Sequence, residues 1–352
     1  MAAFGRVERL ALGAVALLSL LAGIANYVPF SATPRFLIAT LALMGLAWLV
    51  SLGTEQVGFH FGPAATGVLQ ATLANLPELF VVLFALNAGD LVIAQSAVVG
   101  SLLANALLVL GTVILVGARR APGGVMRFSA RLPNDTATLL LVTAFIIVLL
   151  GLVLSTHEPA AHHVEAISVV GAVGLLVVYA SWLIHHLRTP DQREGVPGEA
   201  RLTLRGSVTL LAIAGVGSAF VSDWFVNSLR PAISTLGLSA SFVGIVVVAI
   251  AGNAVEHVAG IVLAARGRYE LAISVVKSSV AQIAAFLFPA IVLISLLLPT
   301  HLTFALRPIY IGALTLMALA VQQVTGDGEA VAFEGYALIT LYLVVAVVVA
   351  FD

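Results

Sequence analysis

Two short polar motifs interrupt an otherwise apolar chain. They read ATLANLPELF and AIAGNAVEHV, and each contains the pattern Asn-x-x-Glu, formed by Asn75 with Glu78 and by Asn253 with Glu256. A spacing of three residues places both side chains on one face of a helix. Each motif therefore offers an amide oxygen beside a carboxylate, which is the chemistry of a cation ligand.

The segment that follows each motif adds a further set of polar side chains. Ser101 and Asn105 follow the first motif, and Ser278 or Ser279 with Gln282 follows the second. Carboxylate, amide and hydroxyl oxygens together suit a hard cation. The sequence leaves open which of the two serines faces the site.

The two acids explain how such a site could enforce exchange. Pro77 and Gly252 weaken the motif helices and free backbone carbonyls as further ligands. An empty site with two negative charges resists a dry, occluded state, whereas one divalent cation or two protons neutralise Glu78 and Glu256. The alternative is that both acids are protonated, or bonded to the neighbouring Asn, and only hold helices together.

The composition shows which solvent surrounds these motifs. The chain has 352 residues, of which 61% are hydrophobic and 9% charged, with a mean hydropathy of +1.12. Soluble domains carry about 25% charged residues, so a soluble enzyme is excluded. A net charge of −1 gives no indication of nucleic-acid binding, and the absence of Cys excludes disulfides and thiol chemistry.

Apolar segments long enough to cross a bilayer follow one another along the whole chain. Helices are the expected form, because lipid cannot satisfy a free backbone amide. The first segment is expected to be a retained helix rather than a signal peptide. We predict an all-α integral membrane protein with eleven transmembrane helices, at 10–28, 35–53, 62–87, 92–117, 134–155, 165–187, 204–229, 239–265, 270–298, 303–323 and 333–351.

Basic residues divide unequally between the two sides that these spans define. Twelve arginines fall on the side of the N-terminus, and only Arg35, Arg230 and Arg307 fall on the other side. The excess predicts a cytoplasmic N-terminus and an outer C-terminus. The short N-terminus and linker favour a prokaryotic plasma membrane.

A polar stretch near the middle divides the chain into similar halves. We predict an N-terminal extra helix (1–33), a first five-helix repeat (34–187), a cytoplasmic linker (188–203) and a second five-helix repeat (204–352). Five is odd, so the two repeats must enter the membrane in opposite directions. The predicted architecture is therefore one helix plus two inverted repeats.

At these motifs the sequence resembles the cation/proton exchanger branch of the calcium/cation antiporter superfamily. That family carries motifs close to ATFGNAPEL and GNAAEH, which are matched here by ATLANLPEL and GNAVEH. The resemblance extends over roughly 34–350. Further similar segments are GTEQ (53–56), GSLLAN (100–105), SDWFV (222–226), LGLSASFVG (236–244) and SSVAQIA (278–284).

The resemblance implies roles for individual residues. Glu78 and Glu256 would bind the metal cation and exchange it for protons. Glu55 and Asp223 would lie beside the site or on the proton path, although Glu55 also fits a solvated acid at a helix end. The residues that would line the site are Asn75, Asn253, Asn105 and Gln282, with Ser101 and Ser279 nearby.

Two further residues near the second motif could tune it. His257 adjoins Glu256 and could relay protons or adjust that carboxylate. Lys277 is the only Lys in the chain and stands where the family usually has a small residue. Its amine either reaches water past the end of its helix or reaches Glu78 or Glu256, which would favour a monovalent ion.

The resemblance implies a secondary antiporter that exports Ca²⁺ from the cytoplasm in exchange for H⁺. The alternatives are a monovalent-cation (Na⁺ or K⁺)/H⁺ exchanger and a Na⁺/Ca²⁺ exchanger on the same fold, and Mn²⁺ is another candidate substrate. An intramembrane enzyme is disfavoured, because no HExxH or GxGD motif is present. No cofactor beyond the transported ions is expected, and the sequence leaves a homo-oligomer open.

Overall fold

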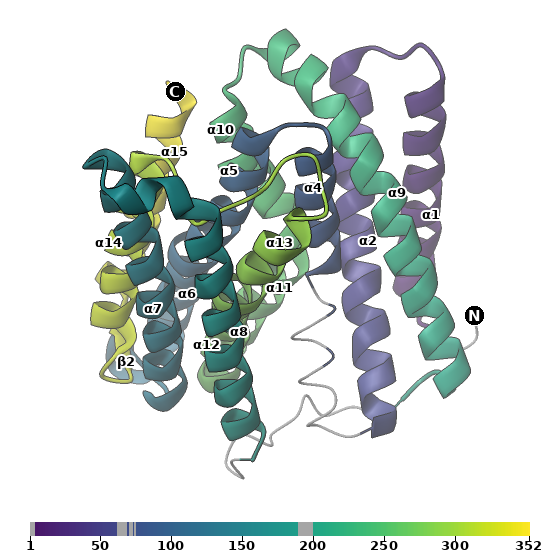
Figure 1. The fold of residues 1–352 in the computed structure, drawn as a ribbon. Helices are drawn as coiled ribbons and strands as arrows, with labels where there is room; N and C mark the ends of the chain where they lie inside the picture. The colour runs from purple at the N-terminus through teal and green to yellow at the C-terminus, as the bar shows by residue number, and fades with distance from the viewer. Residues whose placement is uncertain (1–3, 62–68, 70–72, 74, 189–199) are drawn as a thin grey trace.

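The structure is a bundle of helices that run between two opposite ends of the molecule (Figure 1). This computed structural model describes residues 4–61, 69, 73, 75–188 and 200–352. Within these residues, ten helices are long and apolar enough to cross a membrane, and one shorter apolar helix accompanies them. The expected all-helical membrane architecture is confirmed, with one small sheet in addition.

The elements form two series in chain order, separated by the central polar stretch. The first series contains α1 (Arg6–Tyr27), α2 (Ala32–Phe61), α4 (Leu76–Asn87), α5 (Leu91–Leu103), η1 (Ala104–Val109), α6 (Leu110–Arg120), β1 (Val125–Arg127), α7 (Arg131–Ser155) and α8 (Val164–Arg188). The second contains α9 (Leu204–Leu236), α10 (Ala240–Phe242), η5 (Val243–Val248), α11 (Ala249–Ala265), α12 (Tyr269–Gln282), η6 (Ile283–Leu287), α13 (Phe288–Ser295), α14 (Pro308–Thr325), β2 (Glu329–Val331) and α15 (Ala332–Ala350).

One predicted span ends too early. The span 204–229 was placed to end before Arg230, but α9 continues to Leu236 and is capped by Gly237 in the left-handed conformation (φ 65°). The Arg230 Nε donates to Asp90 Oδ2 at 2.6 Å, so the charge is neutralised by the protein and the helix need not end there. A partner distant in sequence therefore determines this boundary.

The start of one further span lies mostly outside the described residues, and another span starts later than predicted. Of the predicted span 62–87, the structure describes a continuous helix only from Leu76, and most of 62–74 lies outside the described residues. The span predicted at 303–323 begins at Pro308. The apolar residues before it, Leu302 and Phe304, are 1% and 0% exposed in a loop, so they belong to the core rather than to a membrane-spanning helix.

Within the described part of the chain, three π-helical segments occur inside the long helices. The segment η1 lies within the α5–α6 helix and contains Asn105, and η6 lies within the α12–α13 helix directly after Gln282. The third, η5, precedes the helix that carries the second motif. A π-helical turn contains one extra residue and frequently marks a functional site. The sequence analysis did not predict these segments.

The segments that connect the helices form two groups, one at each end of the bundle, and contacts occur within each group. At one end, β1 pairs antiparallel with β2, and Arg201 forms an ion pair with Glu8 at 2.8 Å. The ion pairs at the other end are Arg230 with Asp90, His301 with Glu165, and Arg307 with Asp352. This grouping agrees with the predicted alternation of loops between two sides.

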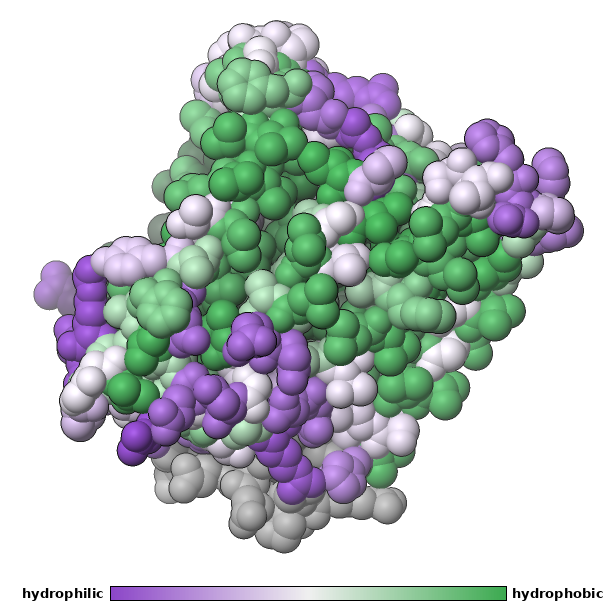
Figure 2. Space-filling view, turned by 90° about the vertical axis from the view of Figure 1, so that its left-hand side faces the viewer, coloured by the Kyte–Doolittle hydropathy of each residue, from purple (hydrophilic) through white to green (hydrophobic). Residues whose placement is uncertain are grey.

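The outer surface has the character expected of a protein surrounded by lipid. Figure 2 shows a face on which hydrophobic side chains cover the middle, while hydrophilic ones gather toward the margins. Large apolar side chains such as Phe145 (65% exposed) and Leu316 (66% exposed) project from the middle of helices. A soluble protein would bury such residues.

The helices α5 and η5 cross with their backbones in contact. A Cβ atom on Gly100 would lie 2.4 Å from Ile245 Cα, and one on Gly244 would lie 1.9 Å from Ser96 Oγ. Small residues permit this close approach between membrane helices. The crossing positions the Ser101 helix against the helix of the second motif.

We expect Gly100→Ala to destabilise the protein by about 2 kcal/mol, because the added methyl group meets backbone atoms that cannot rotate away. The measurement is the midpoint of thermal unfolding in detergent. Gly174→Ala is the matched control, since a Cβ there has no heavy atom within 4 Å. Equal midpoints for the two variants would contradict the close crossing.

Candidate cation-binding site

The first motif acid lies at the start of a helix. Asn75 precedes α4, Pro77 occupies its first turn, and Glu78 follows in the same turn. The positive end of a helix dipole favours a carboxylate in the first turn. Glu78 is only 2% exposed, so this carboxylate lies inside the protein.

The second motif acid lies within an unbroken helix. The Asn253 Nδ2 donates to the Ala249 carbonyl at 3.1 Å, and α11 continues through Gly252 without a break. The predicted weakening of the helix at Gly252 is therefore wrong, and the distortion occurs upstream in η5. Glu256 is partly exposed. A Cβ on Gly252 would lie 3.7 Å from Glu78 Cβ, so the two motif helices meet at this point.

Polar side chains from both series converge on the two acids. The Asn253 Nδ2 donates to Ser101 Oγ at 3.1 Å, and both residues neighbour the Glu78 carboxyl. The Asn105 Nδ2 donates to the Ser101 carbonyl at 3.0 Å. The two carboxyl groups are close enough to interact electrostatically. The structure thus brings together the residues that the sequence placed in separate halves.

Ser278 and Ser279 differ in burial and in their position relative to the second motif acid. Ser279 is 2% exposed and lies beside the Glu256 carboxyl. Ser278 is one residue away on a different face of α12, and it is only partly buried. Gln282 is also partly buried and ends α12 immediately before η6.

The site contains oxygen atoms that have no hydrogen-bond donor within the described part of the chain. Buried polar atoms in proteins are almost always paired, so a group of unpaired ones needs an explanation. A hard cation takes carboxylate, amide and hydroxyl oxygens as ligands, so a bound cation would satisfy five of these atoms. They are both carboxylate oxygens of Glu78, Oε2 of Glu256, Oδ1 of Asn105 and Oγ of Ser279.

The two acids on the long helices lie apart from this group. Glu55 is partly buried near the end of α2. Asp223 is partly buried on α9 and accepts a hydrogen bond from Asn227 Nδ2 at 3.2 Å. The interactions described for Glu78 and Glu256 include neither of these acids. A function on the proton path remains a prediction for both.

His257 lies in the protein interior near the second motif. It is 8% exposed, and its Nε2 has no hydrogen-bond partner among the residues that the structure describes. It shares a helical stripe with Asn253 and Gly260, and a Cβ on Gly260 would contact α12 and α6. Glu256 points from the adjacent face of α11. The predicted effect of His257 on that carboxylate stays untested.

Lys277 occupies neither of the two positions expected for it. Its side chain is 0% exposed, so the amine does not reach water. Its Nζ donates to Thr325 Oγ1 at 3.2 Å, at the end of α14, and no ion pair with Glu78 or Glu256 occurs among the described residues. The negative end of the α14 dipole lies there and compensates part of the positive charge.

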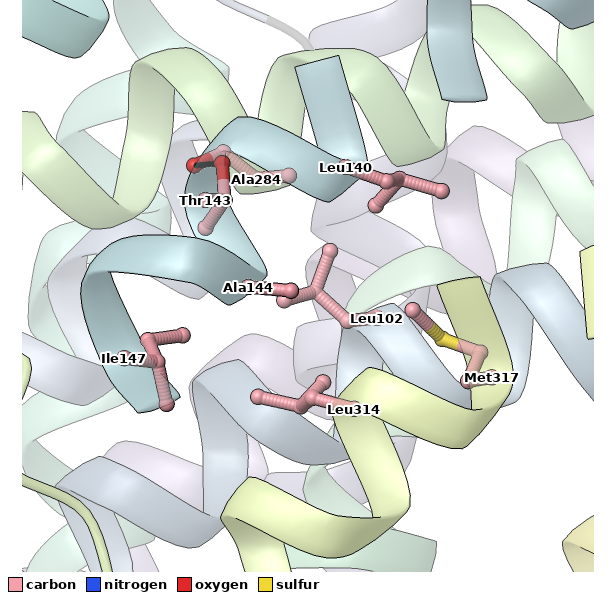
Figure 3. Close-up of a pocket in the computed structure, with 8 residues that line it drawn as sticks. All are labelled: Leu102, Leu140, Thr143, Ala144, Ile147, Ala284, Leu314 and Met317. Atoms are coloured by element: carbon pink, nitrogen blue, oxygen red, sulfur yellow. Dashed lines mark hydrogen bonds between the residues drawn. The ribbon is translucent and has the colours of Figure 1, made fainter. Parts of the chain in front are cut away.

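A small apolar cavity lies close to η6 but does not belong to the site (Figure 3). Its lining is hydrophobic apart from Thr143 on α7. The Thr143 hydroxyl contacts the carbonyls of Leu139 at 2.9 Å and of Ala284, within η6, at 3.4 Å. The hydroxyl is thus engaged with backbone, and the cavity offers no path for an ion.

The fold and the site can now be compared with known proteins. The family described as "Sodium/calcium exchanger protein" matches residues 31–187 and 206–351, which together form most of the chain. The chain belongs to this family. It is a transporter and not an enzyme. The resemblance to cation/proton exchangers seen in the motifs is confirmed.

Individual relatives agree with this membership. The chain is 33% identical to the "Vacuolar calcium ion transporter" of Schizosaccharomyces pombe over 92% of this chain and 80% of the relative. It is 29% identical to the "Ca(2+)/H(+) antiporter" of Synechocystis sp., over 92% of each chain. Both matches extend far beyond the two motifs.

Solved structures show the same fold. The structure named "Structure of native YfkE" aligns with a TM-score of 0.82 at 23% identity, covering 97% of this chain and 100% of the other. The structure named "Crystal Structure of H+/Ca2+ Exchanger CAX" aligns with a TM-score of 0.75 at 17% identity, covering 98% and 92%. At these identities the likeness concerns the fold alone.

Proposed function

We propose that the protein exchanges Ca²⁺ for H⁺ across a membrane at a site formed by Glu78 and Glu256. The observation that carries this proposal is the group of unpaired acceptor oxygens around the two acids. Oxygen ligands of this kind, with two carboxylates, suit Ca²⁺. The names of the relatives from Schizosaccharomyces pombe and Synechocystis sp. support the same substrates.

Charge neutralisation couples the two ions. With both acids ionised and no cation bound, occlusion of the site costs several kcal/mol in a low-dielectric interior. One Ca²⁺ removes the net charge, and so do two protons. Only a loaded site therefore passes readily between its two orientations, and the result is exchange rather than leak.

We further propose the full layout of eleven crossings, with the extra helix in 1–33, the repeats in 34–187 and 204–352, and the linker in 188–203. The corresponding positions of η1 and η6, each next to the polar residue of its half, support an internal repeat. The shorter α4 would form part of the eleventh crossing together with the residues that precede it.

The proposed orientation has the N-terminus in the cytoplasm and the C-terminus outside. The support is the excess of arginines on one side of the predicted spans. Exchange would then export Ca²⁺ while protons enter. The short linker between the proposed repeats suits a prokaryotic plasma membrane.

The remaining polar residues would support the two acids. Asn105 and Ser279 would supply neutral oxygens to the ion. Glu55, Asp223 and His257 would carry protons to or from it. The other residues proposed to line the site are Asn75, Asn253, Ser101, Ser278 and Gln282.

The test is cation-dependent proton flux in proteoliposomes with a preset pH gradient. Calcium, sodium, potassium, magnesium and manganese are added one at a time, and we expect calcium to dissipate the gradient at the lowest concentration. A saturable response would also distinguish an exchanger from a channel. Dissipation by sodium or potassium and not by calcium would replace the proposed ion with a monovalent one.

A further inference from the structure

Some arginines at each end of the bundle form ion pairs with carboxylates, and others do not. At the end that carries Asp352, the guanidinium groups of Arg230 and Arg307 each form an ion pair with an Asp. The Arg307 guanidinium accordingly holds the pKa of the Asp352 carboxyl below its usual value. These charges are balanced within the protein.

At the opposite end, four exposed arginines gather where α6 ends and α11 turns into α12. They are Arg119, Arg120, Arg266 and Arg268, which we call the arginine cluster. The Arg120 Nη1 donates to the Ala265 carbonyl at 2.6 Å, so its guanidinium lies at the base of the turn that carries Arg266 and Arg268. Within the described residues, none of the four forms an ion pair with a carboxylate.

Three acids on neighbouring elements make contacts of their own. The Glu270 Oε2 accepts a hydrogen bond from the Ser129 amide at 2.6 Å. Glu329 forms an ion pair with Arg127 at 3.1 Å. The Glu334 Oε2 accepts from the Val331 amide at 2.9 Å and caps α15. The four guanidinium groups of the cluster are therefore accessible to an anion from outside the chain.

Exposed aromatic side chains place the cluster at the level of the membrane surface. The Arg119 guanidinium contacts the Tyr336 hydroxyl and lies 5.7 Å from the centre of its ring. Tyr336 is 48% exposed, and Phe333, one turn earlier on α15, is 71% exposed. Aromatic rings with this exposure are typical of the boundary between headgroups and acyl chains.

We propose that the arginine cluster binds the phosphate headgroup of an anionic phospholipid, with the acyl chains against Phe333 and Tyr336. Arginine forks match phosphate oxygens well, and basic pockets between membrane helices favour such headgroups. A bound headgroup bridges the end of α6 to the turn after α11, the helix that carries Glu256. The site is independent of which cation is transported.

The experiment measures the midpoint of thermal unfolding of the purified protein in a mild non-ionic detergent. Phosphatidylglycerol, phosphatidylcholine and inorganic phosphate are added separately. We expect phosphatidylglycerol to raise the midpoint by about 3 °C at concentrations well above its dissociation constant. Phosphatidylcholine and inorganic phosphate should give less than half of that shift.

The variant Arg266→Gln/Arg268→Gln should lose more than half of the phosphatidylglycerol shift. No hydrogen bond or ion pair is described for either guanidinium, so the fold should tolerate the change. Arg6→Gln/Arg9→Gln removes the same charge from α1, which lies elsewhere on the same end, and should keep the shift. Equal losses in both variants, no shift in the unaltered protein, or a full shift with inorganic phosphate would each overturn the proposal.

Discussion

Replacing Glu256 by Gln should lower calcium-driven proton flux by at least about 100-fold, and Glu78→Gln should do the same. Gln keeps the volume and an oxygen ligand, but it can neither ionise nor carry a transported proton. The loss of one charge next to a divalent ion costs several kcal/mol even at an effective dielectric constant near 20. The measurement is the initial rate of gradient dissipation in proteoliposomes.

The matched control for this pair is Glu165→Gln. Glu165 is exposed and pairs with His301 at 2.8 Å at one end of the bundle, far along the chain from either motif. Its variant should retain the rate of the unaltered protein. Normal flux in Glu78→Gln or Glu256→Gln, with the midpoint of thermal unfolding unchanged, would leave the acids a structural role only.

The second large effect concerns the buried amine of Lys277. Thr325 Oγ1 is the acceptor that the structure places beside it. Thr325→Val removes this oxygen and leaves the buried Lys277 amine without that acceptor. We therefore expect the free energy of unfolding to fall by about 2–3 kcal/mol. The double variant Lys277→Met/Thr325→Val removes the charge as well and should regain most of that loss.

The control is Thr315→Val on the same helix. The Thr315 hydroxyl donates only to the Ile311 carbonyl of its own helix, at 2.7 Å. Its removal should have a small effect on thermal unfolding. If Thr325→Val and Thr315→Val unfold alike, the interaction with Lys277 contributes nothing. An unchanged calcium affinity in Lys277→Met would place this amine outside the cation site.

The two motifs predicted which polar residues lie together inside the protein. They did not predict the positions of individual side chains on α12. The spacing of Asn and Glu was sufficient to predict that Asn253 and Glu78 lie in one region, since few polar residues are available in so apolar a chain. The position of Lys277 was not predictable, because no periodicity in the sequence of α12 indicates which face lies toward Thr325. For the same reason, the sequence could not predict which of Ser278 and Ser279 faces the site.

The ends of helices and their π-helical distortions could not be predicted from the sequence pattern either. The end of α9 depends on Asp90, which lies 140 residues earlier in the chain. The π-helical segments η1 (ANALLV) and η6 (IAAFL) consist mostly of residues that are compatible with an ordinary α-helix. Their extra residue depends on packing against neighbouring helices, and composition alone carries no sign of it.

The extra residue in η1 has a consequence for how Asn105 can move. One residue corresponds to a rotation of about 100° around a helix axis. If the bulge migrates by one turn, the side chains that it passes rotate by that angle while both ends of the helix stay in place. The Asn105 amide could then leave or rejoin the ion by a local turn of the helix, without any sliding of α5 and α6 against the surrounding lipid.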